Sequence, residues 1–289
     1  MPETVSEAIK SKMEGMSPTY RKIALFLLEN MFNLGFVSVN EMGRILGVSN
    51  ATVVRFSQML GFSGYKEMRE CVSREIRSRS ADEKQVALSK LDELPVTLQV
   101  SELFGNEIAN IKDCQERIKA ETLGQVVKHI EEAEKLFVAG FGASADVAHL
   151  FSRQLIPLTK RPVMFLGGSV SDYMVRLNQL TERDYVMLLT LPSYSPEGWQ
   201  IVNYAKQQKA KVCLFTDSPS CPMYPMSDDV VFFGRKSVLS LNSFVGFVAV
   251  AQVLKNLLLV QQKGVKMQDL EKVLEEEGNG YQFIKNHIS

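Results

Sequence analysis

The sequence holds few of the residues from which metal centres are built. It has three histidines, and its four cysteines show no CxxC spacing and have no histidine clustered beside them. A structural zinc site needs four such ligands at short spacing, so we expect no metal. No Walker motif or nucleophile triad is visible, and we expect no bound cofactor. These absences favour a protein that binds its partners over one that turns over a substrate.

Excess charge of one sign and long apolar runs are missing as well. The 33 Lys/Arg balance 33 Asp/Glu, and the longest apolar stretch, residues 244–260, is interrupted by Gly246, Gln252 and Lys255. That stretch predicts a buried helix and not a membrane span. Residues 1–16 carry charge throughout, so we expect no signal peptide, a cytoplasmic location and reduced thiols.

The length of 289 residues is enough for two domains, and their charge differs slightly. Residues 1–80 hold 11 Lys/Arg against 8 Asp/Glu, whereas the remainder holds 22 against 25. A mild positive excess in the first part suits contact with phosphates, although ordinary variation between domains also accounts for it. We predict a helical domain at 1–76, a polar linker ending at Pro95 and a connecting helix within 77–119, and an α/β domain with C-terminal helices at 120–289.

Residues 39–60 fit a helix-turn-helix, the bihelical unit with which many proteins enter the major groove of DNA. Gly47 allows the tight turn because it can adopt positive φ, and Ser49 is a natural N-cap for the second helix. Helix, glycine, helix also occurs in domains that never bind DNA. The polar and small residues between the inward-facing positions are of the kinds that read base edges and grip phosphates: Asn50, Ala51, Thr52, Arg55, Ser57 and Gln58.

This part of the chain resembles the N-terminal domain of the RpiR (MurR/RpiR) family of bacterial transcriptional regulators. The resemblance is carried by residues 21–24 (RKIA), 48–49 (VS), 51–56 (ATVVRF) and 60–65 (LGFSGY). The family usually has alanine at the position of Gly43, where we expect glycine to weaken the helix by up to about 1 kcal/mol and to be sterically harmless. The resemblance implies DNA contacts from Ser49, Asn50, Thr52, Arg55 and Gln58, with Lys66 near the DNA backbone.

From residue 135 onward, short apolar runs alternate with helical patterns. The runs KLFVAG, RPVMFLG, DYVMLLT, KVCLFTD and DDVVFFG each predict a strand of about five residues. Such alternation is typical of a doubly wound parallel sheet with helices on both faces, which binds ligands at the carboxyl ends of its strands.

The residues after the first three predicted strands are rich in glycine and hydroxyl groups. Gly140 and Gly142 follow the first strand, and Ala145 in place of a third glycine argues against a dinucleotide-binding fingerprint. Hydroxyl-bearing loops that converge on one sheet edge form an uncharged cradle suited to phosphate or sugar hydroxyls. Serines that only fill loops and cap helices would account for each one singly. The candidate ligand-binding residues are Gly142, Ser144, Ser193, Tyr194 through its amide, Ser195, and Ser240 before the last long helix.

Residues 120–263 resemble the SIS (sugar isomerase) domain, a phosphosugar-binding fold. The resemblance is carried by Gly140, Gly142 and Ser144, by the loop 193–195 and by Thr216-Asp217. In the family the phosphate loop commonly reads Ser-x-Ser-Gly-x-Thr, whereas here Pro196 replaces the glycine and Gly198 stands at the threonine position. Proline removes a donor and glycine lacks a hydroxyl. Three alternatives stay open: an effector held differently, one without a phosphate, or none.

An isomerase needs a base near the sugar, and the candidates are Glu197 and His149. We weigh this enzyme as an alternative to the regulator, together with a regulator whose SIS domain serves only for dimerisation. The preferred interpretation is a regulator of carbohydrate metabolism genes, controlled by a phosphorylated sugar, with repression as the commoner mode. It would bind a double-stranded operator as a homodimer or a dimer of dimers, since each helix-turn-helix reads one half-site.

Overall fold

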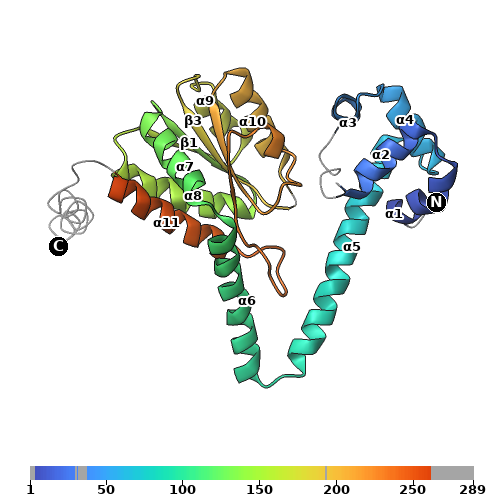
Figure 1. Cartoon of the computed structure of the whole chain (residues 1–289), viewed down its shortest axis with the longest axis horizontal. Helices are drawn as coiled ribbons and strands as arrows, with labels where there is room; N and C mark the ends of the chain where they lie inside the picture. Colours follow the sequence, from blue (N-terminus) through green and yellow to red (C-terminus); the bar gives the residue numbers. More distant parts are fainter. Residues whose placement is uncertain (1–3, 30, 32–37, 193, 262–289) are drawn as a thin grey trace.

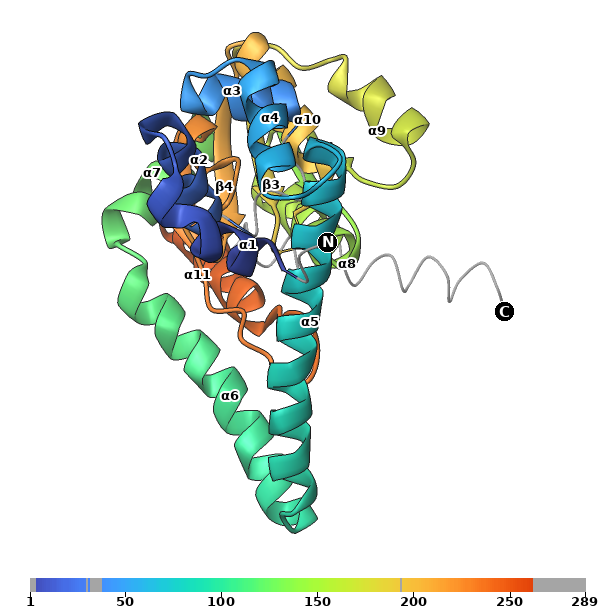
Figure 2. The same ribbon diagram turned by 90° about the vertical axis from the view of Figure 1, so that its right-hand side faces the viewer.

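The computed structural model describes residues 4–29, 31, 38–192 and 194–261. Features predicted at Gly35, at Ser193 and over 262–289, including the helix expected at 267–277, lie outside the described residues. A helical lobe and a lobe built on a parallel sheet are joined by two long helices that meet at one end (Figures 1 and 2). This architecture confirms the predicted fold class.

The helical lobe packs around one apolar core. Ile23, Val53 and Phe56 are fully buried in it, and the ring of Phe56 meets that of Tyr20 edge to face with centroids 5.5 Å apart. The first two helices thereby supply the apolar support that two short helices lack by themselves. The elements are α1 (Val5–Lys12), η1 (Met13–Gly15), α2 (Pro18–Glu29), α3 (Val39–Leu46), α4 (Asn50–Met59) and the beginning of α5 (Tyr65–Asp92).

Helix α5 continues to Asp92, so most of the segment predicted as a linker is helical, and only residues 93–95 separate it from α6 (Val96–Arg117). Residues 77–92 contain no glycine or proline and follow a helix that is already formed. Each added residue therefore extends that helix without a new nucleation cost. Their polarity, from which we predicted a linker, is compatible with a helix that spans solvent between domains.

The sheet has five parallel strands in the order β2-β1-β3-β4-β5. Helices α7, α8 and α11 bury their apolar residues on one face, and α9 and α10 on the other. The strands are β1 (Leu136–Gly140), β2 (Val163–Leu166), β3 (Tyr185–Leu189), β4 (Lys211–Thr216) and β5 (Asp229–Phe232). The helices are α7 (Ala120–Glu132), α8 (Ala143–Leu155), η3 (Ile156–Leu158), α9 (Val170–Leu177), α10 (Pro196–Gln207), η4 (Tyr224–Met226) and α11 (Val245–Gln261).

Along the chain, the second strand lies beside the first and the third lies on its other side. The strand order therefore reverses between β1 and β3, and such a switch point leaves a crevice outside the carboxyl ends of these strands. Gly140 at the end of β1 lies opposite Leu189 at the end of β3, so the loops that follow these two strands begin side by side at this position. No helix among the residues placed by the structure is both long and apolar enough to cross a bilayer.

Candidate functional site

Helix α4 presents a polar surface on the side opposite its buried residues. Gly47 adopts φ of 65°, and the Ser49 hydroxyl accepts from the amide of Thr52 at 3.2 Å, as predicted for the turn and the N-cap. Ser49, Asn50, Arg55 and Gln58 are exposed and Thr52 is half-buried. Ala51, Arg55 and Gln58 follow the i, i+4, i+7 spacing of one helix face. This face has the shape and chemistry of a recognition helix.

Several charged side chains fix the position of this bihelical unit from other helices. The ammonium of Lys22 donates to the carbonyl of Leu46 at 2.8 Å, and that of Lys12 donates to the carbonyl of Met59 at 2.6 Å. Both lysines therefore cap helix C-termini, where cations are favoured. The buried carboxylate of Glu75 accepts from the first amides of α1, with Val5 N at 2.9 Å. From the sequence these residues could be interpreted only as surface charges, because their partners lie far away in the chain.

Two expectations for the helix-turn-helix need correction. Ser57 is fully buried and its hydroxyl donates to the carbonyl of Val53 at 3.0 Å, so it is not available to DNA. Gly43 is not merely harmless: a Cβ there would lie 2.8 Å from the carbonyl oxygen of Val48 and from Oδ1 of Asn50. The glycine therefore lets the turn close tightly against α3. Lys66 is exposed in the first turn of α5.

At the carboxyl edge of the sheet, α8 begins directly after β1 with very little space between them. A Cβ on Gly140 would lie 2.6 Å from Cβ of Ala148 and from the carbonyl oxygen of Ser144. Gly142 is exposed at φ 55°, and the amide of Ser144 closes the turn on the carbonyl of Phe141 at 3.1 Å. The first strand thus delivers a helix N-terminus to the switch point, an arrangement that favours an anion.

The remaining predicted ligand residues occupy different environments. The hydroxyl of Ser195 accepts from the amide of Gly198 at 3.1 Å and caps α10. The side chain of Tyr194 is buried, and burial raises the pKa of its hydroxyl, which donates to Asp217 Oδ1 at 3.1 Å. Ser240 is exposed and its amide donates to the hydroxyl of Ser237 at 3.1 Å. Ser144 lies with Gly142 at the β1 turn, whereas Ser193 is outside the described residues.

A charged network centred on Arg235, a residue that no sequence pattern indicated, ties the loops at this edge together. The guanidinium of Arg235 donates from Nε to Asp217 Oδ2 at 2.6 Å and from Nη1 to Asn242 Oδ1 at 3.1 Å. Asn242 Nδ2 in turn donates to the carbonyl of Pro192 at 2.6 Å. The groups come from the loops after β3, β4 and β5; Asp217 and Asn242 stood out in the sequence, whereas Arg235 did not.

The two candidate bases of an isomerase, His149 and Glu197, lie on different helices, α8 and α10. The exposed ring of His149 stacks on Phe165, with centroids 4.7 Å apart and an angle of 25°. Glu197 is half-buried in the first turn of α10. Within residues 4–29, 31, 38–192 and 194–261, no group of three His, Cys, Asp or Glu is placed to hold a metal ion. The four cysteines are all buried.

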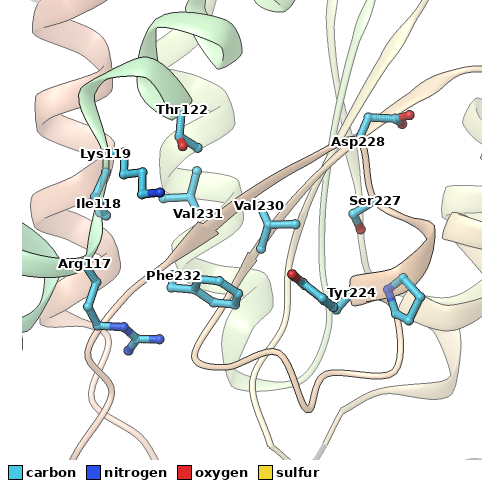
Figure 3. Close-up of a pocket in the computed structure, with 11 residues that line it drawn as sticks. Arg117, Ile118, Lys119, Thr122, Tyr224, Ser227, Asp228, Val230, Val231 and Phe232 are labelled. Carbon is cyan, nitrogen blue, oxygen red and sulfur yellow. The ribbon is translucent and has the colours of Figure 1, made fainter.

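Another polar cluster and a cavity lie elsewhere in the sheet lobe. The buried carboxylate of Asp229 accepts from the hydroxyl of Tyr185 at 2.6 Å and lies 2.6 Å from Nδ1 of His129. Tyr185 and Asp229 are at the amino ends of β3 and β5, opposite the switch point, and His129 is in the last turn of α7. A cavity of about 550 Å³ runs beside the edge strand β5, where the guanidinium of Arg117 lies 5.3 Å from the ring centroid of Phe232 (Figure 3).

The recognition-type helix and the doubly wound sheet define the class: a helix-turn-helix DNA-binding protein with an α/β domain. Comparison with protein families agrees, since residues 3–79 match the helix-turn-helix domain of the rpiR family and residues 129–234 match the SIS domain. The chain is a transcriptional regulator that belongs to the RpiR family.

Similar proteins cover most of its length. The HTH-type transcriptional regulator RpiR of Escherichia coli K12 is 25% identical over 281 residues, covering 90% of this chain and 88% of its own. The structure of Vibrio vulnificus NanR complexed with ManNAc-6P is 20% identical, with TM-score 0.62 over 94% of this chain and 97% of NanR. The sugar isomerase domain of an RpiR transcription factor from Sphaerobacter thermophilus has 23% identity and TM-score 0.57, covering 62% of this chain and 97% of that domain. At such identities the solved structures show that the fold is shared.

Proposed function

We propose that this regulator binds a phosphorylated sugar at the switch point between β1 and β3 and that this binding changes its affinity for an operator. The observation that carries the proposal is the pairing of β1 with β3, which starts the loops after both strands side by side next to the N-terminus of α8, within a SIS domain. The similarity to NanR, whose structure contains ManNAc-6P, supports a phosphosugar as the chemical class. Gly142 and Ser144 after β1, Ser193, the Tyr194 amide and Ser195 after β3, and Ser240 are the proposed contacts.

On the DNA side, the proposed contacts are Ser49, Asn50, Thr52, Arg55 and Gln58 on α4, with Lys66 on the phosphate backbone. The protein would act in the cytoplasm, where bacterial DNA lies, and as a repressor. A two-fold operator calls for two copies, so the active form is a homodimer or a dimer of dimers. The sheet lobe would bind the sugar without converting it, because the named relatives are regulators and His149 is stacked on Phe165.

A thermal-shift screen of the full chain against phosphorylated and unphosphorylated sugars and amino sugars tests this function. A ligand of the folded state at a hundred times its Kd adds about 2.7 kcal/mol of stability. We expect one sugar phosphate to raise the Tm in the wild type and in the control Ser89→Ala, and to lose that effect in Ser193→Ala. No shift with any compound would contradict sensing and favour the alternative in which the SIS domain is only a dimerisation scaffold. Conversion of a sugar phosphate, followed by NMR, would favour the isomerase.

A further inference from the structure

The segment 234–243, which connects β5 to α11, lies between the sheet edge and helix α6. Figure 1 shows this loop extending alongside α6, and its middle lines a cavity of about 350 Å³ together with Leu103, Phe104 and Glu107. Helix α6 is the element that leads through residues 93–95 to α5 and the DNA-binding lobe. The segment is therefore one place where the sheet edge and the connecting helix share contacts, beside the hydrogen bond from Arg117 at the end of α6 to the carbonyl of Asp217.

Towards the sheet edge, the segment is held by its two ends. Arg235 donates to the carboxylate of Asp217, which also accepts from Tyr194, and Asn242 donates to the carbonyl of Pro192. Arg235 and Asn242 are also bonded to each other at 3.1 Å. The Pro192 carbonyl accepts from Asn242, and Tyr194 shares the Asp217 carboxylate with Arg235, so displacement of Pro192 or Tyr194 changes the contacts of the segment 234–243.

Towards α6, the same segment is held through its backbone and one hydroxyl. Asn106 Nδ2 and Asn110 Nδ2 both donate to the carbonyl of Lys236, at 2.9 and 2.8 Å. Glu107 accepts from Asn110 at 3.1 Å and from the hydroxyl of Ser243. Three polar residues of α6, Asn106, Glu107 and Asn110, thus contact only two residues of the segment. Displacement of the Lys236 carbonyl has to move both asparagine side chains or break their hydrogen bonds.

Close packing attaches the C-terminal half of α6 rigidly to this region. A Cβ on Gly234 would lie 2.7 Å from the carbonyl oxygen of Asn110, and one on Gly246 would collide with the carbonyl oxygen of Gly234. The thiol of Cys114 donates to the carbonyl of Asn110 at 3.1 Å and accepts from the amide of Gly234 at 3.4 Å. Helix, loop and α11 are in direct backbone contact here, and packed contacts of this kind transmit small shifts.

We propose that residues 234–243 are the relay that couples the switch point of the sheet to α6, with Arg235 as its positioning residue. The relay deepens the proposed function, on which it rests, by naming the route of regulation. A sugar phosphate that rearranges the loop after β3 alters two hydrogen bonds of the segment, the one between Arg235 and Asp217 and the one between Asn242 and Pro192. The displaced Lys236 carbonyl then shifts α6, and α5 carries the shift to α4. This requires a ligand with different affinity for the two positions of the loop.

Hydrogen exchange of the full chain tests the relay without any ligand. Arg235→Ala removes ionic hydrogen bonds, so we expect amides of residues 186–191 and of 103–111 both to exchange about tenfold faster or more. Lys236→Ala is the matched control, because it removes an adjacent exposed cation and keeps the carbonyl that Asn106 and Asn110 use. Faster exchange confined to residues 234–243 would overturn the proposal.

The reciprocal variant covers the case in which Arg235→Ala fails to fold. Asn106→Ala removes only one half-buried side-chain amide from α6, and coupling is mutual, so amide exchange should also rise in residues 186–191. An increase limited to α6 would contradict the relay.

A second experiment tests whether the relay carries the regulatory response, and it uses the sugar phosphate that raises the Tm most in the screen. In Arg235→Ala this compound should still raise the Tm, yet its effect on the affinity for a DNA duplex selected by the wild type should fall at least tenfold. A full regulatory response in Arg235→Ala would overturn the relay. If no compound in the screen binds, the proposed sensing fails, whereas the exchange experiment still decides whether the two regions are coupled.

Discussion

At the residue scale, the proposed DNA contacts differ in whether the side chain also has a hydrogen-bond partner among the described residues. Arg55 is exposed on α4, four residues after Ala51 and three before Gln58. Ser49 and Asn50, by contrast, also cap and link helices: Ser49 holds Thr52, and Asn50 Nδ2 donates to Asn40 Oδ1. Substitution of these two would therefore mix a loss of recognition with a loss of stability, and Arg55 is the cleaner probe.

We expect Arg55→Ala to weaken specific binding by about 5- to 150-fold, the loss of about 1–3 kcal/mol for a base-reading guanidinium. The measurement is a titration with a duplex selected by the wild-type protein from random sequences, repeated at several salt concentrations. The Tm should stay within about 1 °C, because the side chain is exposed. Arg153→Ala, an exposed arginine on α8, is the control. Unchanged affinity in Arg55→Ala would remove this residue from the DNA interface.

At the element scale, the sheet lobe shows how close backbone packing sets the position of α6 and α11. Gly246 lies in the first turn of α11, where an added Cβ meets the backbone of Gly234 and comes within 3.1 Å of the Cys114 sulfur. Backbone atoms cannot move aside as a flexible side chain does. The gain in helix propensity from alanine is therefore smaller than the steric cost.

Gly246→Ala should lower the free energy of unfolding by about 1–3 kcal/mol. Gly105→Ala on α6 is the matched control, since nothing lies within 4 Å of its Cβ position and alanine should raise helix stability by up to about 1 kcal/mol. Urea titrations followed by circular dichroism measure both values. Equal changes in the free energy of unfolding from the two substitutions would mean that the close approach of α11 and Gly234 does not contribute to stability.

Elements were predictable from the sequence where a local pattern decides them. The five apolar runs all form parallel strands, and Ser49 and Gly47 behave as their local chemistry requires. The extent of α5 was not predictable in this way, because a polar helix and a polar linker share one composition. Glu75 and Arg235 were missed for a different reason: their partners lie 70 and 18 residues away, and only the fold brings them together.

At the scale of the whole molecule, the two lobes have separate cores. The apolar residues of the helical lobe form a cluster that ends at Ile76 of α5, and both clusters of the sheet lobe begin at or after Cys114. The connecting stretch from Lys84 to Ile108 exposes several apolar side chains, among them Val96 and Phe104. A displacement of one lobe can be passed along such helices to the other lobe. Because the stretch buries little apolar surface between the two lobes, each lobe should unfold as its own cooperative unit.

Calorimetry of the full chain should accordingly show two unfolding transitions, each sensitive to substitutions in one lobe. Ile23→Ala removes a fully buried side chain from the helical core and should cost about 2–5 kcal/mol in the transition of that lobe alone. Asp229→Ala leaves His129 and Tyr185 without their buried partner and should lower the other transition, by about 3 kcal/mol. A sugar phosphate bound at the sheet edge would raise only this second transition. A single transition shifted by both variants would instead show that α5 and α6 join the lobes into one cooperative unit, and the relay would then act through shared stability and not through displacement of α6.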